Sequence, residues 1–321
     1  MQESIASDPN VAAPSWLFSC PTCGSSLPLG PSPVHCPGCN RRFECQKGIW
    51  RFLSQQSLAR YEPFLRRYEQ VRADEGWGVP KPEYFRELPT VSEDDPQRSI
   101  WLRRQWSFRT LVSRVVAPHA AALDRAPRIV DAGAGNCWLT HRLGELGHSV
   151  AAVDISLHEL DGLGAGGWYE PAFRDHAVLI QAEFDRLPLA ANQADLVIFN
   201  ASLHYSADIG ESLREALRVL RPDGTIVIID SPTYGDSRAG EHMIEEREAA
   251  FEARYGRQAA PLAMEGFLTK RRLAAIGDSV ELRWTFFSDG SAARRMAAGL
   301  RTRLSTRRER AAMPLIIGNR I

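Results

Sequence analysis

The sequence lacks a surplus of charge of either sign. Its 321 residues include 39 Lys and Arg and 39 Asp and Glu, so the formal net charge at pH 7 is zero. A balanced chain has no general electrostatic attraction to nucleic acid or to an anionic membrane surface. Hydrophobic residues make up 44% of the chain, which is enough for a full core, and the length leaves room for about two domains.

Long apolar runs are also missing. No stretch approaches the roughly 20 apolar residues of a membrane span. The first residues have neither the basic start nor the apolar segment of a secretion signal. These features argue against a membrane protein and make the cytoplasm the expected location. Residues 1–16 are mostly small and polar, and we expect a mobile leader there.

Cysteine is scarce, but its spacing is informative. Four of the six cysteines form two Cys-x-x-Cys pairs, Cys20 with Cys23 and Cys36 with Cys39. Without an export signal, this spacing indicates a metal site rather than disulfides, with free thiols as the alternative. Two such pairs supply the tetrahedral four-sulfur site that zinc prefers. Residues 17–53 are too few to bury a core alone, so zinc would hold them together as a ribbon. Cys45 and His35 are expected to lie outside the site.

The middle of the chain carries a strand–turn–helix–strand pattern. Residues 128–131 form a short apolar run that ends in an acid, and residues 137–146 have helical periodicity before a second strand ends at Asp154. Between them, Gly133 and Gly135 would let a ligand approach main-chain N–H groups, because no Cβ stands in the way. An acid about 20 residues beyond such a turn can accept hydrogen bonds from both ribose hydroxyls. The pattern predicts a nucleoside site.

Two kinds of nucleoside compete for this site. A dinucleotide-binding loop needs a third glycine, at the position that Trp138 occupies here. The bulk of Trp138 disfavours NAD or FAD but suits S-adenosylmethionine (SAM), which has no phosphates. Asp131 would repel a diphosphate, yet it could pair with the α-amino group of a methionine moiety. A plain turn between strand and helix is the remaining alternative.

Residues from about 127 to 230 resemble a class I SAM-dependent methyltransferase of the group that often acts on small molecules. Four motifs match in order: residues 131–135, residues 181–188 after the third strand, residues 195–204 at the fourth strand, and residues 213–230 with their Pro-x-Gly turn. The resemblance implies an α/β, Rossmann-like, mostly parallel sheet with an antiparallel last strand. The cysteine pattern resembles the zinc ribbons of some bacterial methyltransferases, including some that modify guanine in ribosomal RNA.

The resemblance assigns SAM-binding roles to ten positions. They are Asp131, Ala132, Gly133, Gly135, Asp154, Ile155, Glu183, Phe184, Asn200 and Arg103. Asp154 would hold the ribose, and Glu183 would reach the adenine amino group, although the family more often has Asp there. Arg104 is the alternative to Arg103 as partner of the methionine carboxylate.

Aromatic and proton-transfer roles stay open at this stage. Trp101 or Trp106 would face the sulfonium by resemblance, with burial in the core as the alternative. His204 and Tyr205 follow the fourth strand, where the methyl group should lie, and Asp230 and Tyr234 are second choices. A histidine there could take a proton from the acceptor, since its ordinary pKa is near neutrality, or it could merely pack against loops.

The sequence predicts four segments. They are a leader (1–16), the zinc ribbon (17–53), a helical linker that caps the cofactor (54–117), and a SAM-binding domain (118–321) with an insert at 231–261. In the linker, residues 58–71 have a helical pattern, and one helix face is shared by Tyr61, Leu65, Tyr68 and Val71. The charged insert could cover the substrate or form a solvated surface helix. A helix over residues 294–310 is rich in arginine and could meet an anionic partner, although a solvated face is the simpler interpretation.

These features favour a SAM-dependent methyltransferase with a structural zinc ribbon. An O, N or C atom of a small metabolite would attack the sulfonium methyl in line, and zinc would take no part, because a four-sulfur site has no open position. One alternative makes ribosomal or transfer RNA the acceptor, through the ribbon and the arginine-rich helix. A second is a non-enzymatic, zinc-dependent interaction module.

Overall fold

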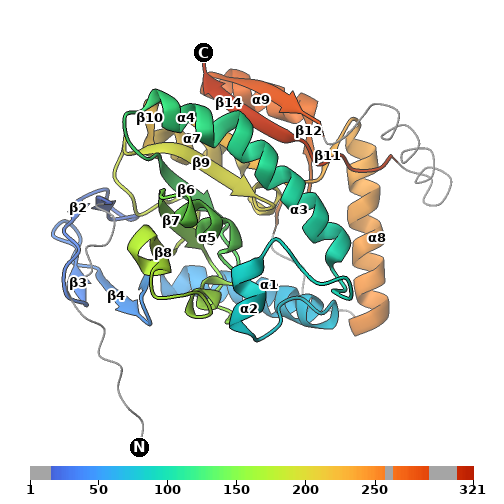
Figure 1. Cartoon of the computed structure of the whole chain (residues 1–321), viewed down its shortest axis with the longest axis horizontal. Helices are drawn as coiled ribbons and strands as arrows, with labels where there is room; N and C mark the ends of the chain where they lie inside the picture. Colours follow the sequence, from blue (N-terminus) through green and yellow to red (C-terminus); the bar gives the residue numbers. More distant parts are fainter. Residues whose placement is uncertain (1–15, 257–262, 289–308) are drawn as a thin grey trace, which may run out of the picture.

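The computed structural model describes residues 16–256, 263–288 and 309–321. A ten-stranded sheet runs through this part of the chain, in the order β13-β14-β10-β9-β6-β7-β8-β5-β4-β3 (Figure 1). Its strands are β3 (Val34–His35), β4 (Arg42–Gln46), β5 (Ile49–Arg51), β6 (Arg128–Ala132), β7 (Ser149–Asp154), β8 (Ala177–Gln181), β9 (Ala194–Asn200), β10 (Leu220–Ile229), β13 (Leu282–Phe287) and β14 (Leu315–Arg320). Two short pairs stand apart, β1 (Phe18–Ser19) with β2 (Ser26–Leu27) and β11 (Thr233–Tyr234) with β12 (Leu268–Thr269).

The central strands are parallel and the last two are antiparallel. Strands β10, β9, β6, β7 and β8 pair in parallel, whereas β14 runs antiparallel to both β10 and β13. This confirms the predicted Rossmann-like α/β fold. Strand β10 begins at Leu220, before the Pro-x-Gly turn of the 213–230 motif, and its pairing with β9 is irregular between Leu220 and Thr225.

Helices cover both faces of the sheet (Figure 1). They are α1 (Gln55–Asp74), α2 (Pro82–Glu87), α3 (Arg98–Leu111), α4 (Ala117–Ala122), α5 (Trp138–Glu145), α6 (Phe173–His176), α7 (Ile209–Val219), α8 (Ser237–Tyr255) and α9 (Lys270–Val280). Successive strand residues point to opposite faces, so Val130 joins the core under α7 and α9, and Ile129 joins the core under α3 and α5. Burial on both faces explains why the strands are almost wholly apolar.

The N-terminal ribbon shares its sheet with the rest of the fold. Ile49 of β5 pairs in parallel with Leu179 of β8, and β4 and β3 extend the sheet outward. Phe52, just after β5, donates its main-chain N–H to the carbonyl of Gln181 at 2.9 Å. Its ring packs against Phe43, with 4.8 Å between centroids, in the same core as the methyltransferase-like strands. The ribbon is therefore built into the sheet rather than appended to it.

Several predicted segments reach residues outside the described part. The arginine-rich helix over 294–310 falls almost entirely within 289–308, and the leader falls within 1–15 except for Trp16. Trp16 is buried, with the Arg128 guanidinium 4.4 Å from its ring centroid. The described portion of the insert, residues 231–256, contains β11 and α8. Among described residues, no helix is both long enough and apolar enough to cross a membrane.

Because the ribbon shares the sheet and core, weakening it should destabilise the whole fold. We expect Phe52→Ala to lower the free energy of unfolding by about 3–5 kcal/mol, the usual cost of removing a buried phenylalanine ring. Leu102→Ala, on the exposed side of α3, is the control and should change little. Urea unfolding followed by circular dichroism tests this. A separate early transition, with the main transition unchanged, would show that the ribbon unfolds independently.

Candidate active site

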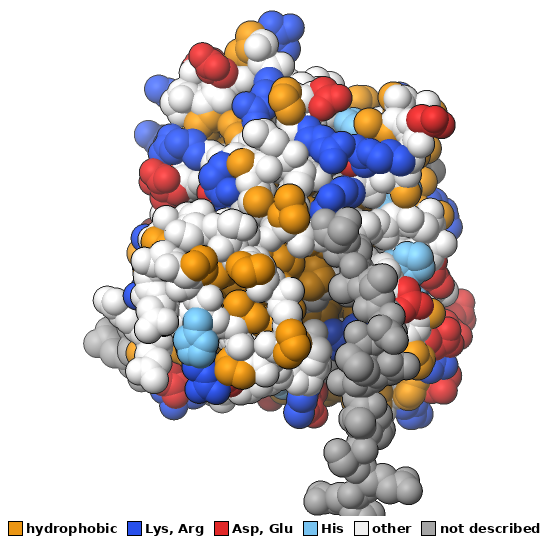
Figure 2. Space-filling model, turned by 90° about the vertical axis from the view of Figure 1, so that its left-hand side faces the viewer, with side chains coloured by type: hydrophobic (Ala, Val, Ile, Leu, Met, Phe, Trp, Pro, Cys, Tyr) orange, Lys and Arg blue, Asp and Glu red, His pale blue; other side chains and the backbone are white. Residues whose placement is uncertain are grey.

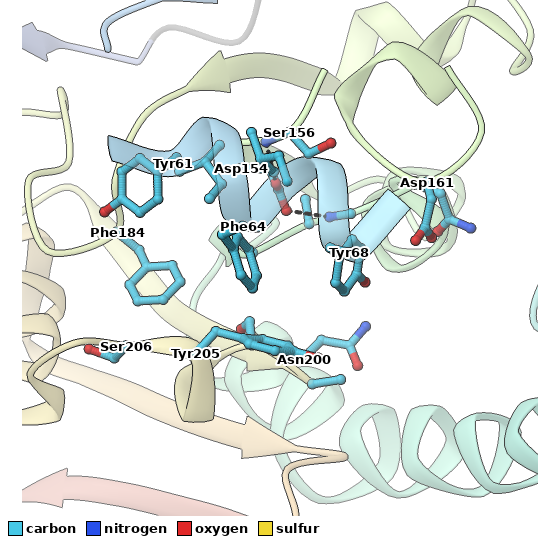
Figure 3. A pocket seen from close by; sticks show the side chains of 18 of the residues that line it. Tyr61, Phe64, Tyr68, Asp154, Ser156, Asp161, Phe184, Asn200, Tyr205 and Ser206 are labelled. Carbon is cyan, nitrogen blue, oxygen red and sulfur yellow. Dashed lines mark hydrogen bonds between the residues drawn. The ribbon is translucent and has the colours of Figure 1, made fainter. Parts of the chain in front are cut away.

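A cavity lies where the parallel strands β6, β7, β8 and β9 end (Figure 3). Its floor comes from residues 133–136, 154–156, 183–185, 200–202 and 205–207, together with Trp138 and Asp161. Its cover comes from α1, through Tyr61, Phe64, Leu65, Tyr68 and Arg72, and from Arg104 of α3. This edge is where ligands bind in open α/β sheets, because the loops after neighbouring strands meet there.

The glycine loop after β6 has the close approach that the sequence predicted. Gly133 has a φ of +80°, and a Cβ on it would lie 2.2 Å from Cβ of Ser202, so a larger residue cannot fit without movement. Gly135 also has a positive φ, and its N–H donates to Oδ2 of Asp154 at 2.8 Å. The loop is thereby fixed to the end of β7.

Asp154 stands on the cavity wall, at the position expected of a ribose ligand. Its second oxygen accepts the main-chain N–H of Ser156 at 2.7 Å. Burial raises the pKa of Asp154 to about 6, although these main-chain hydrogen bonds oppose the shift. A carboxylate can accept about four hydrogen bonds, so both oxygens retain capacity for hydroxyl donors from the cavity. Ile155 lies beside it on the same wall.

Asp131 and Ala132 lie beneath the glycine loop and are not on the cavity wall. Oδ2 of Asp131 accepts a hydrogen bond from the Thr140 hydroxyl at 2.7 Å, and Oδ1 has no hydrogen-bond partner among the described residues. Burial raises the pKa of Asp131 to about 7, despite the Thr140 hydrogen bond. A carboxyl group with this pKa is partly protonated near neutrality.

Glu183 lines the cavity, but its carboxylate is already engaged by α1. Arg60 donates to it at 2.8 Å, and the Tyr61 hydroxyl donates to it at 2.8 Å. Its neighbour Asp185 also lines the cavity, and there Oδ1 is buried without a partner among the described residues. Phe184 lies between them. The resemblance to the family motif points to the acid at position 183 and gives no signal for Asp185.

Helix α1 places a row of aromatic rings over the cavity. Tyr61, Phe64 and Tyr68 follow one another at helical spacing, and Figure 3 shows their rings facing Phe184 and Tyr205. Ring centroids lie 5.9 Å apart for Phe64 and Tyr205, and 6.1 Å apart for Tyr68 and Tyr205. Of the helix face predicted from the sequence, Tyr61, Leu65 and Tyr68 line the cavity, and Val71 does not.

Charged groups gather at one end of the cavity. Arg72 of α1 forms a two-point ion pair with Asp161, with 2.7 Å between Nη2 and Oδ1. Arg104 also lines this end, over Trp101 at 4.5 Å from the ring centroid, and burial lowers its pKa. Its Nε is buried with no hydrogen-bond partner among the described residues. A buried guanidinium donor without an acceptor is suited to an anionic ligand group.

Arg103, the residue singled out from the sequence, is not on the wall. Its Nε lies 3.7 Å from Oδ1 of Asp230, away from the cavity lining. Trp101 is wholly buried in the core, and neither it nor Trp106 lines the cavity. The sequence pattern predicts that both arginines lie on one helix, but it does not show which of the two side chains faces the cavity.

His204 and Tyr205 have different environments. Tyr205 lines the cavity, whereas His204 lies behind the wall with its Nδ1 3.2 Å from the Ser231 hydroxyl. Burial lowers the pKa of His204 to about 3, so its protonated form is strongly disfavoured. This geometry favours Tyr205 over His204 as a residue that touches an acceptor. Asp230 and Tyr234 also lie off the wall.

The four paired cysteines come together at one point of the ribbon. The Sγ atoms of Cys20, Cys23, Cys36 and Cys39 all lie within 4.8 Å of one another. The shortest separations are 3.6 Å between Cys20 and Cys39 and 3.5 Å between Cys23 and Cys36. Four sulfurs at about 2.3 Å from a tetrahedral zinc ion lie roughly 3.8 Å apart. The donor set and its spacing fit zinc, and the group includes neither Cys45 nor His35.

Comparison with known proteins adds a family match over the central strands. Residues 130–228 match the family model described as a methyltransferase domain. The malonyl-[acyl-carrier protein] O-methyltransferase of Pseudescherichia vulneris is 25% identical over 171 residues, which cover 48% of this chain and 65% of that protein. The uncharacterized protein YafE of Escherichia coli K12 is 34% identical over 87 residues, which cover 27% of this chain and 41% of YafE. The chain thus spans less than two thirds of these curated relatives.

A solved structure with a similar arrangement is the 1,6-didemethyltoxoflavin-N1-methyltransferase of Burkholderia thailandensis, determined with 1,6-didemethyltoxoflavin and S-adenosylhomocysteine bound. The two chains are 17% identical, with a TM-score of 0.46, and the alignment covers 89% of this chain and 99% of that one.

The buried carboxyl of Asp131 should make the free energy of unfolding depend on pH. Between its ordinary pKa of 3.8 and its pKa of about 7 in the fold, the folded state holds a proton that the unfolded state has released. The contribution of Asp131 to the free energy of unfolding therefore falls by an amount on the order of 4 kcal/mol as pH rises through that window. Above the window it no longer changes with pH. Asp131→Asn should remove this dependence.

The measurement is urea unfolding from pH 4 to 8, read as the difference between wild type and variant. The difference matters because His204, whose pKa is lowered, contributes a slope of the opposite sign between pH 3 and 6.5. Exposed Asp94→Asn is the control. A difference curve that is flat between pH 4 and 7 would contradict the expected burial of a protonated Asp131.

Proposed function

We propose that this chain, whose residues 130–228 match the model of a methyltransferase domain, is a class I SAM-dependent methyltransferase. It would move the methyl group of SAM to a small-molecule acceptor by direct in-line displacement. The observation that carries this proposal is the composition of the cavity. A tight glycine loop, a carboxylate at the end of β7 and a cover of aromatic rings meet at the carboxyl edge of the sheet. These are the partners that a nucleoside with a sulfonium needs.

The cavity residues suggest how SAM would be held. Asp154 would accept the ribose hydroxyls, and the main chain at Gly133 and Gly135 would approach the methionine part. Phe184 would lie against the adenine. Asp185 could share the contact with the adenine amino group that was predicted for Glu183, because Oδ1 of Asp185 is buried and has no hydrogen-bond partner among the described residues. Asp131 and Ala132 would then act from below, by fixing the loop rather than by contact.

The methionine carboxylate is assigned to Arg104 in place of Arg103. Arg104 lines the cavity, whereas Arg103 lies off the wall beside Asp230. The Nε of each arginine is buried without a hydrogen-bond partner among the described residues, so the position on the wall is what separates them. The aromatic rings of Tyr68 and Tyr205 would face the sulfonium, whose positive charge is attracted to ring faces.

Positioning would supply most of the rate. Methyl displacement requires the donor and acceptor to be aligned, and holding them together in a site that excludes water replaces an encounter in solution. Helix α1 covers the cavity, and Arg67 in its second half donates to Glu248 of α8 at 2.6 and 2.7 Å. At the end of α1, Asp74 accepts a hydrogen bond from the Tyr255 hydroxyl at 2.7 Å. A cover of this kind fits a small acceptor better than a polymer.

An RNA acceptor has weaker support. Figure 2 views the end of the molecule that carries the ribbon, and Lys and Arg side chains gather mainly in the upper half of that face. Fewer charged side chains are visible in the lower half of that view, although the ribbon exposes Arg41, Arg42 and Lys47. Affinity for RNA depends on cationic contacts to phosphates, which this part of the surface does not concentrate.

Zinc is assigned to the four-cysteine site as a structural ion. Cys20 and Cys36 are buried, and the site lies beside Phe43 and Phe52 in the ribbon core. All four donors are sulfur, so the ion would have no open coordination position and would stabilise the ribbon without taking part in methyl transfer.

Affinity for the reaction product should depend on only one of the two neighbouring arginines of α3. We expect S-adenosylhomocysteine (SAH) to bind the wild-type protein, and Arg104→Met to weaken it by about ten- to a hundredfold, since a charged hydrogen bond is worth about 1.5–3 kcal/mol. Arg103→Met is the matched control and should change SAH affinity little. Isothermal titration calorimetry measures both. Absence of SAH binding to wild type would remove the proposed function, and a larger loss in Arg103→Met would reverse the assignment.

Zinc content should follow the cysteine pairs. We expect one zinc per chain by inductively coupled plasma mass spectrometry, and loss of that zinc in Cys36→Ser together with a lower unfolding midpoint. Cys45→Ser lies outside the four-cysteine group and should keep the metal. Wild-type protein that is fully folded without any bound metal would contradict the assignment.

A further inference from the structure

Asp161 is the carboxylate at the charged end of the cavity. It lines the cavity from the loop after β7, and it is only 8% exposed. Figure 3 shows Phe184 toward one end of the cavity, Asp154 in the middle and Asp161 at the other end. If Phe184 and Asp154 hold the adenine and the ribose as proposed above, the methionine tail of SAM lies at the end that carries Asp161.

Two separate elements hold Asp161 in place. Its main-chain N–H donates to Nδ1 of His158 at 3.2 Å, within the loop after β7. Its two carboxylate oxygens accept the guanidinium of Arg72, with 2.7 Å between Nη2 and Oδ1. A Cβ on Gly135 would lie 3.9 Å from the carbonyl oxygen of Asp161, so this loop adjoins the glycine loop. A carboxylate accepts about four hydrogen bonds, so Asp161 retains capacity for a further donor.

The same end of the cavity holds the arginine assigned to the methionine carboxylate. The guanidinium carbons of Arg72 and Arg104 lie 3.4 and 5.2 Å from the ring centroid of Trp77, so both groups adjoin one ring. Burial lowers the pKa of Arg104 most strongly, while the negative charge of Asp161 is among the influences that raise it. An acid and an arginine at one end of a cavity match the ammonium and the carboxylate of an amino-acid group.

The other acids near the cavity are less suited to an ammonium group. Asp131, which the sequence predicted for this role, lies off the wall, and burial raises its pKa to about 7. Asp154 accepts two main-chain N–H groups and stands at the ribose position. Glu183 and Asp185 flank the residue assigned to the adenine. Of the described acids that line the cavity, Asp161 is therefore the one at the methionine end.

We propose that Asp161, held by Arg72, binds the α-ammonium group of SAM while Arg104 binds the neighbouring carboxylate. This inference rests on the proposed function. It replaces the pairing of the ammonium with Asp131 that the sequence predicted. Charges of opposite sign then alternate across this end of the cavity, from Arg72 to Asp161, the ammonium, the carboxylate and Arg104. Because each charge of the ligand meets a group of opposite sign, a ligand that lacks either charge should bind more weakly.

Analogues of SAH that each lack one charge test the inference. Deamino-SAH has hydrogen in place of the α-amino group, and decarboxy-SAH has hydrogen in place of the carboxylate. The proteins are wild type, Asp161→Asn, Arg104→Met and Asp131→Asn, and circular dichroism checks that each is folded. A double variant, Arg72→Met with Asp161→Asn, removes the ion pair as a unit, so that no buried guanidinium loses its partner. Isothermal titration calorimetry at neutral pH gives the dissociation constants.

We expect wild type to bind SAH about ten- to a hundredfold more tightly than deamino-SAH. Asp161→Asn and the double variant should reduce this ratio to within about threefold, because an amide oxygen accepts a hydrogen bond but carries no charge. Arg104→Met should keep the ratio for deamino-SAH and lose the preference for SAH over decarboxy-SAH. Asp131→Asn should keep both ratios, whatever its separate affinities. These reciprocal losses would assign one charge of the ligand to each residue.

Three results would overturn the inference. Equal binding of SAH and deamino-SAH to wild type would show that the ammonium has no charged partner. A wild-type ratio in both Asp161→Asn and the double variant, with all ligands weakened alike, would leave Asp161 a structural role only. Loss of the ratio in Asp131→Asn would return the ammonium to the acid predicted from the sequence. Failure of the proposed function is distinct from these, since wild type would then bind no SAH.

Discussion

Parallel pairing of β6 with β7 and β9 is the constraint on which the site depends. It aligns Asp131 with Ala152 and Ile198, so the loops after all three strands begin at one edge of the sheet. Residues far apart in sequence, such as Gly135 and Asp154, then come within hydrogen-bond distance. Burial of the strands on both faces fixes this register, since a slip of one residue would turn apolar side chains to the wrong core.

Helix α1 connects the ribbon to the cavity. It begins at Gln55, after the three residues that follow β5, and its N-cap is Ser54, whose side chain accepts the N–H of Ser57. From there it runs over the cavity as far as Arg72. The position of β5 beside β8 therefore fixes where the aromatic cover starts. A ribbon stabilised by a metal would act on the site through this geometry, because β5 and the first turn of α1 are consecutive in the chain. The ion itself would remain distant from the chemistry.

The sequence predicted features that depend on local spacing. The glycine loop, Asp154, the alternation of strands and helices and the cysteine pairs follow from short patterns, and the structure places them as those patterns indicate. The sequence does not show that β5 pairs with β8, because pairing between strands 130 residues apart leaves no local pattern. It also could not choose Arg104 over Arg103, or show that Glu183 is engaged by α1, because both depend on how separate helices dock.

The cavity concentrates polar groups that the fold leaves unsatisfied. Nε of Arg104, Oδ1 of Asp185 and Oδ1 of Asn200 are buried without partners among the described residues, and each costs about 1–3 kcal/mol. The rest of the fold must offset this, which the two large apolar cores can do. A ligand that satisfies all three recovers that free energy on binding, and one that lacks a matching group does not. These three groups belong to residues that line one cavity, so the polar atoms that cost stability would also favour a ligand with matching groups.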